Sequence, residues 1–310
     1  MLGIVEIASY LPIERISNYD LKEKFNLEDD FIVGKIGIKQ RARKDVNERA
    51  SDLAQKAFES LMKKVDLDKK EIDCCIVVTQ NPDYNIPHTS AILHGKLGLQ
   101  QECACFDIAL GCSGYVYGLS NILAFMQSNG LKNGLLFTSD PYSDIINHED
   151  KNTELIFGDG ATVTYISENP KYIAKYFSFG TNGAAYKEIL CDNKLYMNGR
   201  SVFNFTATTI PPHIKMFLEK HGLGDNDISK YILHQGSKYI VDTIRKRLKI
   251  DVNKVPFDIY EYGNTVSSSV PMMLEKELYD KSNNQLLLSA YGIGLSWGSV
   301  ILERVNFNKG

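Results

Sequence analysis

The chain has 310 residues, of which 44% are hydrophobic and 24% are charged, and its formal net charge is −3. This length and composition are typical of one large or two medium globular domains, and the lack of a basic excess argues against a nucleic-acid partner. No run of about 18 apolar residues occurs, so a membrane span is not expected.

Strand-like and helix-like segments alternate along the chain. The segment Met1–Ile7 contains Glu6 and lacks a basic n-region, so we interpret it as a first strand rather than a signal peptide. The pattern that follows predicts strands at 72–79, 103–110, 134–139 and 161–166, and helices at 89–98 and 112–130. Alternation of this kind predicts an α/β fold.

Six cysteines occur at positions 74, 75, 103, 105, 112 and 191. They form no C-x-x-C pair, and no H-x-x-x-H pattern lies near them. This spacing favours neither a zinc site nor a disulfide framework, so we expect no metal. Free thiols in a chain with a large predicted core are typical of a reducing compartment, and we expect a cytoplasmic location.

Cys112 lies where an apolar run breaks at Gly111 and a helical pattern begins. A strand, a sharp turn, a cysteine and a helix in this order indicate a nucleophile elbow. The N-terminal end of a helix favours a thiolate, so we expect a lowered pKa for the Cys112 thiol. The alternative is a structural cysteine, because a free cysteine also behaves as a small hydrophobic residue.

The sequence contains an internal repeat made of three ordered blocks. The matching pairs are Cys105–Ser113 with Pro256–Thr265, Cys75–Gln80 with Lys230–Gln235, and Phe157–Val163 with Tyr291–Trp297. One short match arises easily by chance, whereas three in the same order indicate duplication. We therefore predict two copies of one α/β unit, an N-terminal half at residues 1–168 and a C-terminal half at residues 169–310.

The duplication brings three chemically useful side chains into one region of the predicted fold. Cys112 and Asn264 occupy corresponding elbows of the two halves, and His234 ends the strand that corresponds to the one ending near Thr79. Elbows related by a pseudo-two-fold axis can face each other across a shared site. Taken alone, His234 could be a core histidine and Asn264 a turn residue, because asparagine tolerates a left-handed backbone.

These motifs, together with Phe157-Gly-Asp-Gly160 and Gly292-Ile-Gly294, resemble those of β-ketoacyl-acyl-carrier-protein synthase III, a condensing enzyme of the thiolase superfamily. The resemblance covers nearly the whole chain. It implies a thiolase-like, duplicated five-layer α-β-α-β-α fold and a homodimer. It also implies that a coenzyme A thioester is a substrate and that no separate cofactor is needed.

The resemblance further implies a Cys112, His234 and Asn264 triad. Cys112 would take an acyl group from a short acyl-CoA, and a malonyl thioester, expected to be malonyl-acyl-carrier protein, would then lose carbon dioxide. His234 and Asn264 would stabilise the resulting enolate, which attacks the acyl group in a decarboxylative Claisen condensation. The backbone N–H groups of Cys112 and Gly294 would form the oxyanion hole.

The resemblance also assigns positions around the substrate, and several of them depart from the usual residues. Phe31 and Lys151 stand where a tryptophan and an arginine usually enclose adenine, and Tyr142 is bulkier than the usual aliphatic residue, which hints at a small or polar acyl group. The residues expected to bind coenzyme A or the acyl chain are Phe31, Ile86, Tyr142, Lys151, Phe157, Phe203 and Gly236, with Ile86 reaching across the dimer. Further departures occur at Arg200, Asn204, Ser237, Tyr239 and Ile293.

Two other functions stay open at this point. Acyl-Cys112 could be transferred to an alcohol or an amine without condensation, or the chain could be a catalytically silent partner subunit. An intact Cys112 argues against the silent subunit, and the pair of His234 and Asn264 argues for condensation.

Overall fold

Two groups of strands with matching order form the centre of the molecule in the computed structural model, which describes residues 1–305. The first group, in spatial order, consists of β1 (Gly3–Tyr10), β7 (Ala161–Ser167), β6 (Gly134–Ser139), β4 (Cys74–Val78) and β5 (Ala104–Ile108). The second group consists of β8 (Tyr172–Thr181), β13 (Ser296–Arg304), β12 (Gln285–Gly292) and β11 (Lys230–Leu233).

The pairing directions repeat between the two groups. In the first group β1, β7 and β6 are antiparallel neighbours, whereas β6, β4 and β5 run parallel. In the second group β8, β13 and β12 are antiparallel and β12 runs parallel to β11. The groups join where Ile4 of β1 pairs with Tyr172 of β8. The boundary predicted between residues 168 and 169 falls in the turn from β7 to β8.

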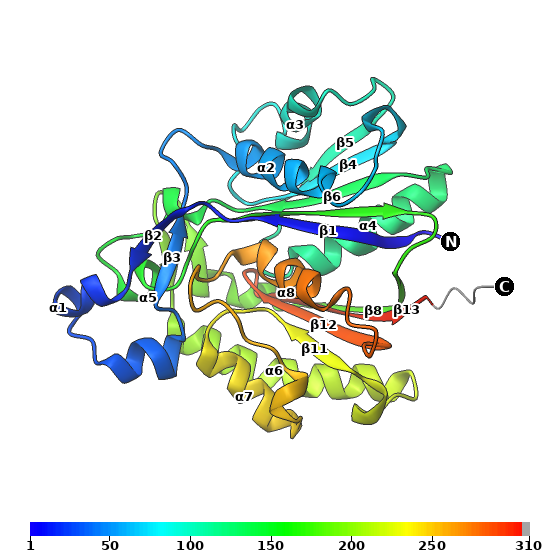
Figure 1. Cartoon of the computed structure of the whole chain (residues 1–310). Coiled ribbons are helices and arrows are strands. Elements are labelled where there is room, and N and C mark those ends of the chain that lie inside the picture. Colours follow the sequence, from blue (N-terminus) through cyan, green and yellow to red (C-terminus); the bar gives the residue numbers. More distant parts are fainter. Residues whose placement is uncertain (306–310) are drawn as a thin grey trace.

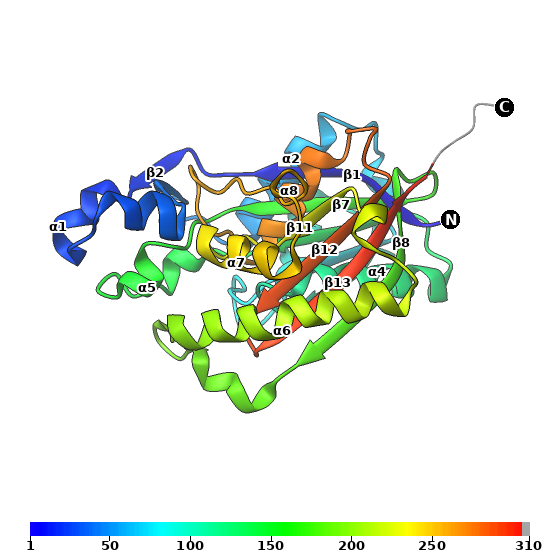
Figure 2. The ribbon, with the colours of Figure 1, turned by 90° about the horizontal axis from the view of Figure 1, so that it is seen from below.

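Helices fill three layers around these two sheets (Figure 1). The helices α4 (Gly114–Asn129) and α8 (Ser269–Glu277) lie between the sheets, whereas α2 (Ala50–Met62) and α3 (Thr89–Leu97) cover the outer face of the first sheet. The outer face of the second sheet is covered by α6 (Gly199–Lys220) and α7 (Lys238–Leu248), as Figure 2 shows from below. This arrangement is the predicted five-layer α-β-α-β-α fold.

The pattern of apolar residues explains which helix takes which layer. In α2 the buried residues recur every three or four positions, so one face packs on the sheet and the other faces solvent. In α4 the long apolar residues lie all around its first turns, and those turns are buried between both sheets. No helix within residues 1–305 is long and apolar enough to cross a membrane.

Short elements complete the described chain. The paired strands β2 (Glu14–Ser17) and β3 (Gln40–Arg43) form one ribbon, and β9 (Ile189–Cys191) and β10 (Leu195–Met197) form another. The remaining α-helices are α1 (Lys22–Phe25) and α5 (Lys151–Glu154), and Phe31–Ile36 forms a π-helical segment. Short 3-10 helices span Tyr19–Leu21, Lys69–Glu71, Tyr142–Asp144, Gly183–Glu188, Asp225–Asp227, Val252–Lys254 and Val266–Ser268.

The predicted elements around Cys112 are confirmed, with small shifts at their ends. The strand predicted at 134–139 is β6, and the helix predicted at 89–98 is α3 followed by its left-handed cap, Gly98. The helix predicted at 112–130 begins only at Gly114, so Cys112 lies in the turn that precedes the helix.

Within residues 169–305 the second half has no counterpart of β5, although the repeat matches Phe257–Ile259 with that strand. Residues 257–259 are irregular, and the side chain of Gln235 takes over part of the hydrogen bonding. Gln235 Nε2 donates to the carbonyl groups of Leu233 (2.8 Å) and Pro256 (3.3 Å), and Gln235 Oε1 accepts from the N–H of Asp258 (3.2 Å). The backbone just after residue 259 is hydrogen-bonded to a different segment, because the carbonyl of Tyr260 accepts from the N–H groups of Lys39 and Gln40, where the chain enters β3.

Candidate active site

A cavity of about 420 Å³ receives side chains from both halves of the fold. Cys112, His234 and Asn264 all line it, together with Gly292 and Ile293. The rest of the lining is mostly apolar and comes from Phe31, Ile36, Ile156, Phe157, Ile189, Met197, Val202, Phe203, Ile240 and Tyr291. The two elbows and the end of β11 therefore meet at one site, as the repeat predicts.

Cys112 is buried at the inner end of this cavity, with 6% of its surface exposed. Burial, followed by the negative charge of Asp140, raises the pKa of the Cys112 thiol to about 12. Backbone N–H groups of Ile293 and of Cys112 itself act in the opposite direction but are outweighed. The expectation of a lowered pKa is therefore wrong, because desolvation in an apolar cavity exceeds the effect of the nearby helix end.

The backbone N–H of Ile293 points to the Cys112 sulfur. Gly294 is not among the described residues that line the cavity. Gly292 makes this approach possible, since a Cβ on Gly292 would lie 2.8 Å from the sulfur. This contact favours Ile293 over Gly294 as the second oxyanion-hole donor, and the assignment stays a prediction. A backbone N–H requires no particular side chain, so the glycine pattern alone did not identify it.

His234 follows β11 and is fixed on its inner side. Its Nδ1 lies 2.6 Å from the hydroxyl oxygen of Ser269, the first residue of α8. Tyr291 packs edge-on against the imidazole ring, with ring centroids 5.5 Å apart. Burial lowers the pKa of His234 to about 3, so the imidazole is neutral at physiological pH. With Nδ1 engaged by Ser269, Nε2 is the ring nitrogen left for a ligand.

Asn264 is oriented by the strained turn that follows it. Its Oδ1 accepts a hydrogen bond from the N–H of Val266 at 2.9 Å, which leaves the amide NH₂ group for the cavity. Val266 has φ of 54°, a left-handed conformation that a β-branched residue rarely adopts. Such strain costs about 1–3 kcal/mol and persists only where the surrounding structure imposes it.

Two glycine motifs hold Asn264 against the first half of the chain. The N–H of Asn264 donates to the carbonyl of Ile156 at 2.9 Å, and the N–H of Gly158 donates to the carbonyl of Asn264 at 3.0 Å. Gly263, which lies where these two backbone segments cross, adopts φ of 80°, a left-handed conformation that would be strained in a residue with a side chain. A Cβ on Gly158 would lie 1.9 Å from the carbonyl oxygen of Tyr262, so this close approach requires glycine.

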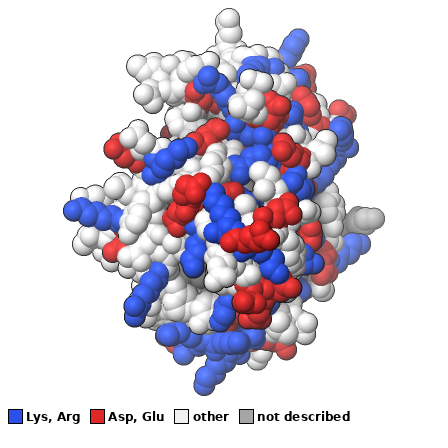
Figure 3. Space-filling view, turned by 90° about the vertical axis from the view of Figure 1, so that its left-hand side faces the viewer, with Lys and Arg blue, Asp and Glu red and all other residues white. Residues whose placement is uncertain are grey.

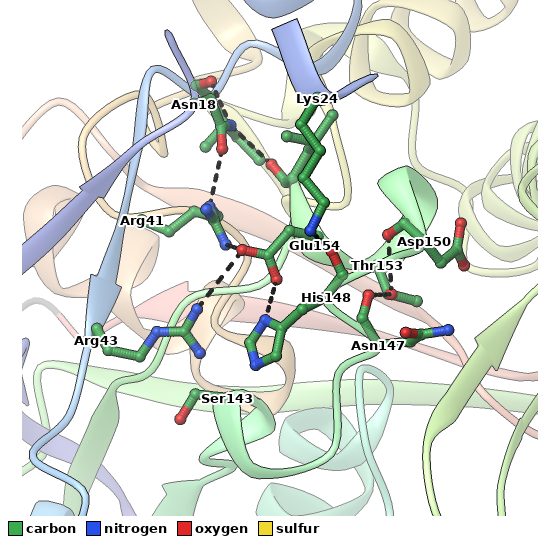
Figure 4. Close-up of polar contacts among 12 residues, drawn as sticks. Asn18, Lys24, Arg41, Arg43, Ser143, Asn147, His148, Asp150, Thr153 and Glu154 are labelled. Atoms are coloured by element: carbon green, nitrogen blue, oxygen red, sulfur yellow. Dashed lines mark hydrogen bonds and ion pairs between the residues drawn. The ribbon is translucent and has the colours of Figure 1, made fainter. Parts of the chain in front are cut away.

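A buried ion pair stabilises the backbone where these two segments meet. The Arg41 guanidinium donates to Asn18 Oδ1 and to Glu154 Oε1, both at 2.9 Å. The other carboxylate oxygen of Glu154 lies 2.6 Å from Nδ1 of His148, as Figure 4 shows. The Arg41 side chain also packs against Gly263, so this network fixes the backbone just before Asn264.

We predict that Gly158→Ala destabilises the protein by about 3 kcal/mol, because the added methyl group forces two backbone segments apart. Gly95→Ala is the matched control, since Gly95 lies in α3 with no atom within 4 Å of the added Cβ, and it should stabilise by about 0.5–1 kcal/mol. The urea midpoint of both variants measures the difference. Equal midpoints for the two variants would contradict the close approach at Gly158.

The mouth of the cavity carries several of the expected coenzyme A residues. Phe31, Phe203 and Gly236 line it, and the Phe203 ring stacks on Tyr239 with centroids 5.0 Å apart. Positive charge at the mouth comes from Lys35, whose Nζ lies 4.7 Å above the Tyr239 ring, and from Arg200.

Three of the expected binding residues, Lys151, Ile86 and Tyr142, do not line this cavity. Lys151 is exposed at the start of α5, and its neighbour Asn152 lines the mouth instead. Ile86 is 86% exposed in a surface loop. Its expected role concerns a partner subunit, so the single chain does not test it.

Tyr142 lies behind the cavity wall rather than in it. Its ring packs against Phe157, with centroids 5.0 Å apart, and its hydroxyl donates to Gln80 Oε1 at 3.0 Å. Phe157 lines the cavity in front of it. Gln80 satisfies the Tyr142 hydroxyl, so that hydroxyl gives no reason to expect a polar acyl group, and the size of the acyl group stays a prediction.

Several residues at the site were missed in the sequence. Ser269 contacts His234, Val266 contacts Asn264, and Ile189 and Met197 line the cavity from the ribbon of β9 and β10. The run Val266–Ser269 directly after Asn264 was the available signal for the first two. Nothing in the sequence indicated the ribbon residues, because their position depends on how the ribbon folds back.

Comparison with known proteins shows the family to which the chain belongs. Residues 106–183 match the model of the 3-oxoacyl-[acyl-carrier-protein] synthase III family, and residues 218–304 match the model of its C-terminal region. The chain is 35% identical to the β-ketoacyl-[acyl-carrier-protein] synthase III of Chlamydia caviae, over 96% of this chain and 95% of the relative. It is 32% identical to that of Caldanaerobacter subterraneus, over 97% of each chain.

Solved structures agree with this similarity. The β-ketoacyl-[acyl-carrier-protein] synthase III of Thermus thermophilus superposes with a TM-score of 0.90 at 30% identity, covering 98% of this chain and 99% of that one. The 3-oxoacyl-(acyl-carrier-protein) synthase of Burkholderia xenovorans superposes with a TM-score of 0.91 at 29% identity, covering 98% and 94%.

The fold and the cavity with its cysteine, histidine and asparagine define a condensing acyltransferase with a thiolase-like fold. The chain belongs to the 3-oxoacyl-[acyl-carrier-protein] synthase III family. It is therefore a condensing enzyme of the 3-oxoacyl-[acyl-carrier-protein] synthase III type, and the predicted family is confirmed.

Proposed function

We propose that the enzyme joins a short acyl group from acyl-CoA to a malonyl thioester carried by acyl-carrier protein, using Cys112, His234 and Asn264. The observation that carries this proposal is that all three side chains line one mostly apolar cavity. In the first half-reaction the Cys112 sulfur attacks the thioester carbonyl and coenzyme A leaves. The proton lost by Cys112 ends on the coenzyme A sulfur, so the exchange needs no net proton uptake.

In the second half-reaction the malonyl carboxylate leaves as carbon dioxide and an enolate forms. His234 Nε2–H and the Asn264 NH₂ group are the donors that would meet the enolate oxygen, each worth roughly 3 kcal/mol in comparable sites. The enolate carbon then attacks the acyl-Cys112 carbonyl. The backbone N–H groups of Ile293 and Cys112 would hold the resulting oxyanion. Its collapse releases the 3-oxoacyl thioester and the Cys112 thiolate, which takes one proton from solvent to restore the thiol.

A two-stage experiment tests this function. Incubation with acetyl-CoA should add an acetyl group to the protein by intact mass, and peptide mapping should place it on Cys112. Addition of malonyl-acyl-carrier protein should then release carbon dioxide and the 3-oxoacyl product. Acylation followed by transfer to an alcohol or amine, without carbon dioxide release, would instead favour the non-condensing function. An enzyme that takes up no acetyl group would overturn the assignment of Cys112.

We place the docking surface for the acidic carrier protein on α7. This helix carries Lys238, Arg245, Lys246 and Arg247 and is capped by Lys249, and its first turn lines the mouth of the cavity through Tyr239 and Ile240. Figure 3 shows Lys and Arg side chains gathered at the lower end of the face on which α7 lies, whereas acidic and basic side chains alternate elsewhere. Basic surface beside a tunnel mouth favours an acidic partner.

We also propose that the enzyme works as a homodimer in the cytoplasm. In the part of the chain that the structure describes, β5 is an edge strand paired only with β4; it carries the half-buried Phe106 and Ile108, and the Phe106 ring packs against Phe125 of α4. An apolar edge of this kind favours pairing with a second copy. The exposed Ile86 would then contact the partner. The six free cysteines agree with a reducing compartment.

A further inference from the structure

Asp140 is a fully buried carboxylate for which the proposed chemistry has no use. It follows directly after β6, and its Oδ1 accepts from the N–H of Gln80 at 2.7 Å and from the hydroxyl of Thr79 at 3.4 Å. Its Oδ2 accepts from the N–H of Ser267 at 3.4 Å and from the Ser267 hydroxyl. Within residues 1–305 no cation pairs with it, so neutral donors alone compensate the buried charge.

One side of this carboxylate holds the turn that orients Asn264. Ser267 directly follows Val266, the residue whose left-handed backbone presents its N–H to Asn264 Oδ1. A strained conformation relaxes unless neighbouring bonds maintain it. The two bonds from Ser267 to Asp140 anchor the far side of this turn, so they act against the relaxation that would let the Asn264 amide swing away from the cavity.

The other side of the carboxylate holds the elbow that carries Cys112. The backbone of Gln80 is bound to Asp140, and the Gln80 side chain packs so closely on Gly111 that a Cβ there would lie 2.3 Å from Gln80 Oε1. The same Oε1 accepts from Tyr142. Asp140 therefore links the Cys112 elbow of the first half to the Asn264 turn of the second.

We propose that Asp140 is a positioning residue that clamps the turn Val266–Ser268 against the Cys112 elbow and thereby holds the Asn264 amide in the geometry needed for decarboxylation. This inference rests on the proposed role of Asn264. Asp140 acts on the acceptor half-reaction through Ser267, whereas acyl transfer to Cys112 depends on the sulfur and on the backbone N–H groups of Ile293 and Cys112. Loss of Asp140 therefore separates the two half-reactions.

The charge of Asp140 also affects the pKa of the Cys112 thiol, which gives a second measurement of its role. The titratable groups that face Asp140 are Cys112 and Tyr142, and its negative charge contributes to the raised pKa of both. Removal of that charge lowers the pKa of the Cys112 thiol, so more thiolate is present at a given alkaline pH. A variant that loosens packing and admits water would lower the same pKa, so the effect of the charge must be measured against a variant that removes a hydrogen bond to Asp140 but keeps its charge.

The test compares Asp140→Asn with the wild-type enzyme in three measurements. Acetylation of Cys112 by acetyl-CoA should keep its rate within about threefold, whereas condensation with malonyl-acyl-carrier protein should fall about a hundredfold, the usual effect of a misplacement of about 1 Å. Alkylation of Cys112 by iodoacetamide at pH 9 should become several-fold faster. Retained acetylation also shows that the variant is folded.

Two further variants make the test specific. Ser267→Ala removes a donor but keeps the charge, so it should slow condensation without changing alkylation. Asp83→Asn is the matched control, because Asp83 is also buried and also accepts from a serine, Ser51, far from Asn264, and it should change neither rate.

The proposal is overturned if Asp140→Asn condenses at the wild-type rate, or if it loses acetylation as severely as condensation. Failure of the wild-type enzyme to be acetylated at all is a separate result, which would overturn the proposed function rather than the role of Asp140.

Discussion

Cys112→Ser should remain folded and lose the ability to take an acetyl group from acetyl-CoA. Serine matches the size of cysteine, but its hydroxyl is a much weaker nucleophile, and His234 is poorly suited to activate it because the lowered pKa of its imidazole makes it a weak base. We expect condensation to fall by on the order of a thousandfold or more, as for the loss of other catalytic nucleophiles. Intact mass after incubation with acetyl-CoA provides the measurement.

Cys191→Ser serves as the control for that substitution. Cys191 is exposed on β9 and does not line the cavity, so its variant should take up one acetyl group like the wild type. An acetyl adduct of normal yield on Cys112→Ser would mean that a different side chain is the nucleophile.

His234→Ala and Asn264→Ala should each retain acetylation of Cys112 but lose condensation by about 10²–10³-fold. The reason is that each variant removes a donor aimed at charge that develops only when carbon dioxide leaves. Single-turnover acetylation and carbon dioxide release, measured separately, distinguish the two steps. His213→Ala, which alters a half-buried histidine in α6 beside Trp297, controls for the general cost of losing an imidazole.

Equal loss of both steps in His234→Ala or Asn264→Ala would contradict their assignment to the enolate. The neutral state of His234 adds a pH criterion. Burial lowers the pKa of His234 from its usual value to about 3, so no loss of condensation from protonation of this ring is expected between pH 5 and 8.

Local sequence was sufficient for the elements that carry the motifs. Apolar runs predicted β4, β6 and β7, and a helical pattern ending at Gly130 predicted α4, because strand and helix periodicity depends on near neighbours. The repeat predicted the duplicated architecture, and it failed at the counterpart of β5. There a glutamine side chain and a crossing segment take the hydrogen bonds, a long-range competition that the residues of 257–259 do not reveal.

At the site, the sequence identified three side chains and missed their environment. Cys112, His234 and Asn264 follow from motif order in a duplicated chain. The raised thiol pKa, the partner of the Tyr142 hydroxyl and the choice of Ile293 over Gly294 do not. Each of these depends on how closely segments more than 50 residues apart approach one another.

By itself, the sequence determined the α/β class, the duplication, the family and the order of the three reactive residues, because these features follow from residue periodicity and from the spacing of motifs. Only the tertiary structure decided which backbone N–H faces the sulfur, that the thiol is protonated and the imidazole neutral, and that Asp140 lies between the two elbows. The physical reason is that desolvation and hydrogen-bond geometry are set by contacts between distant parts of the chain.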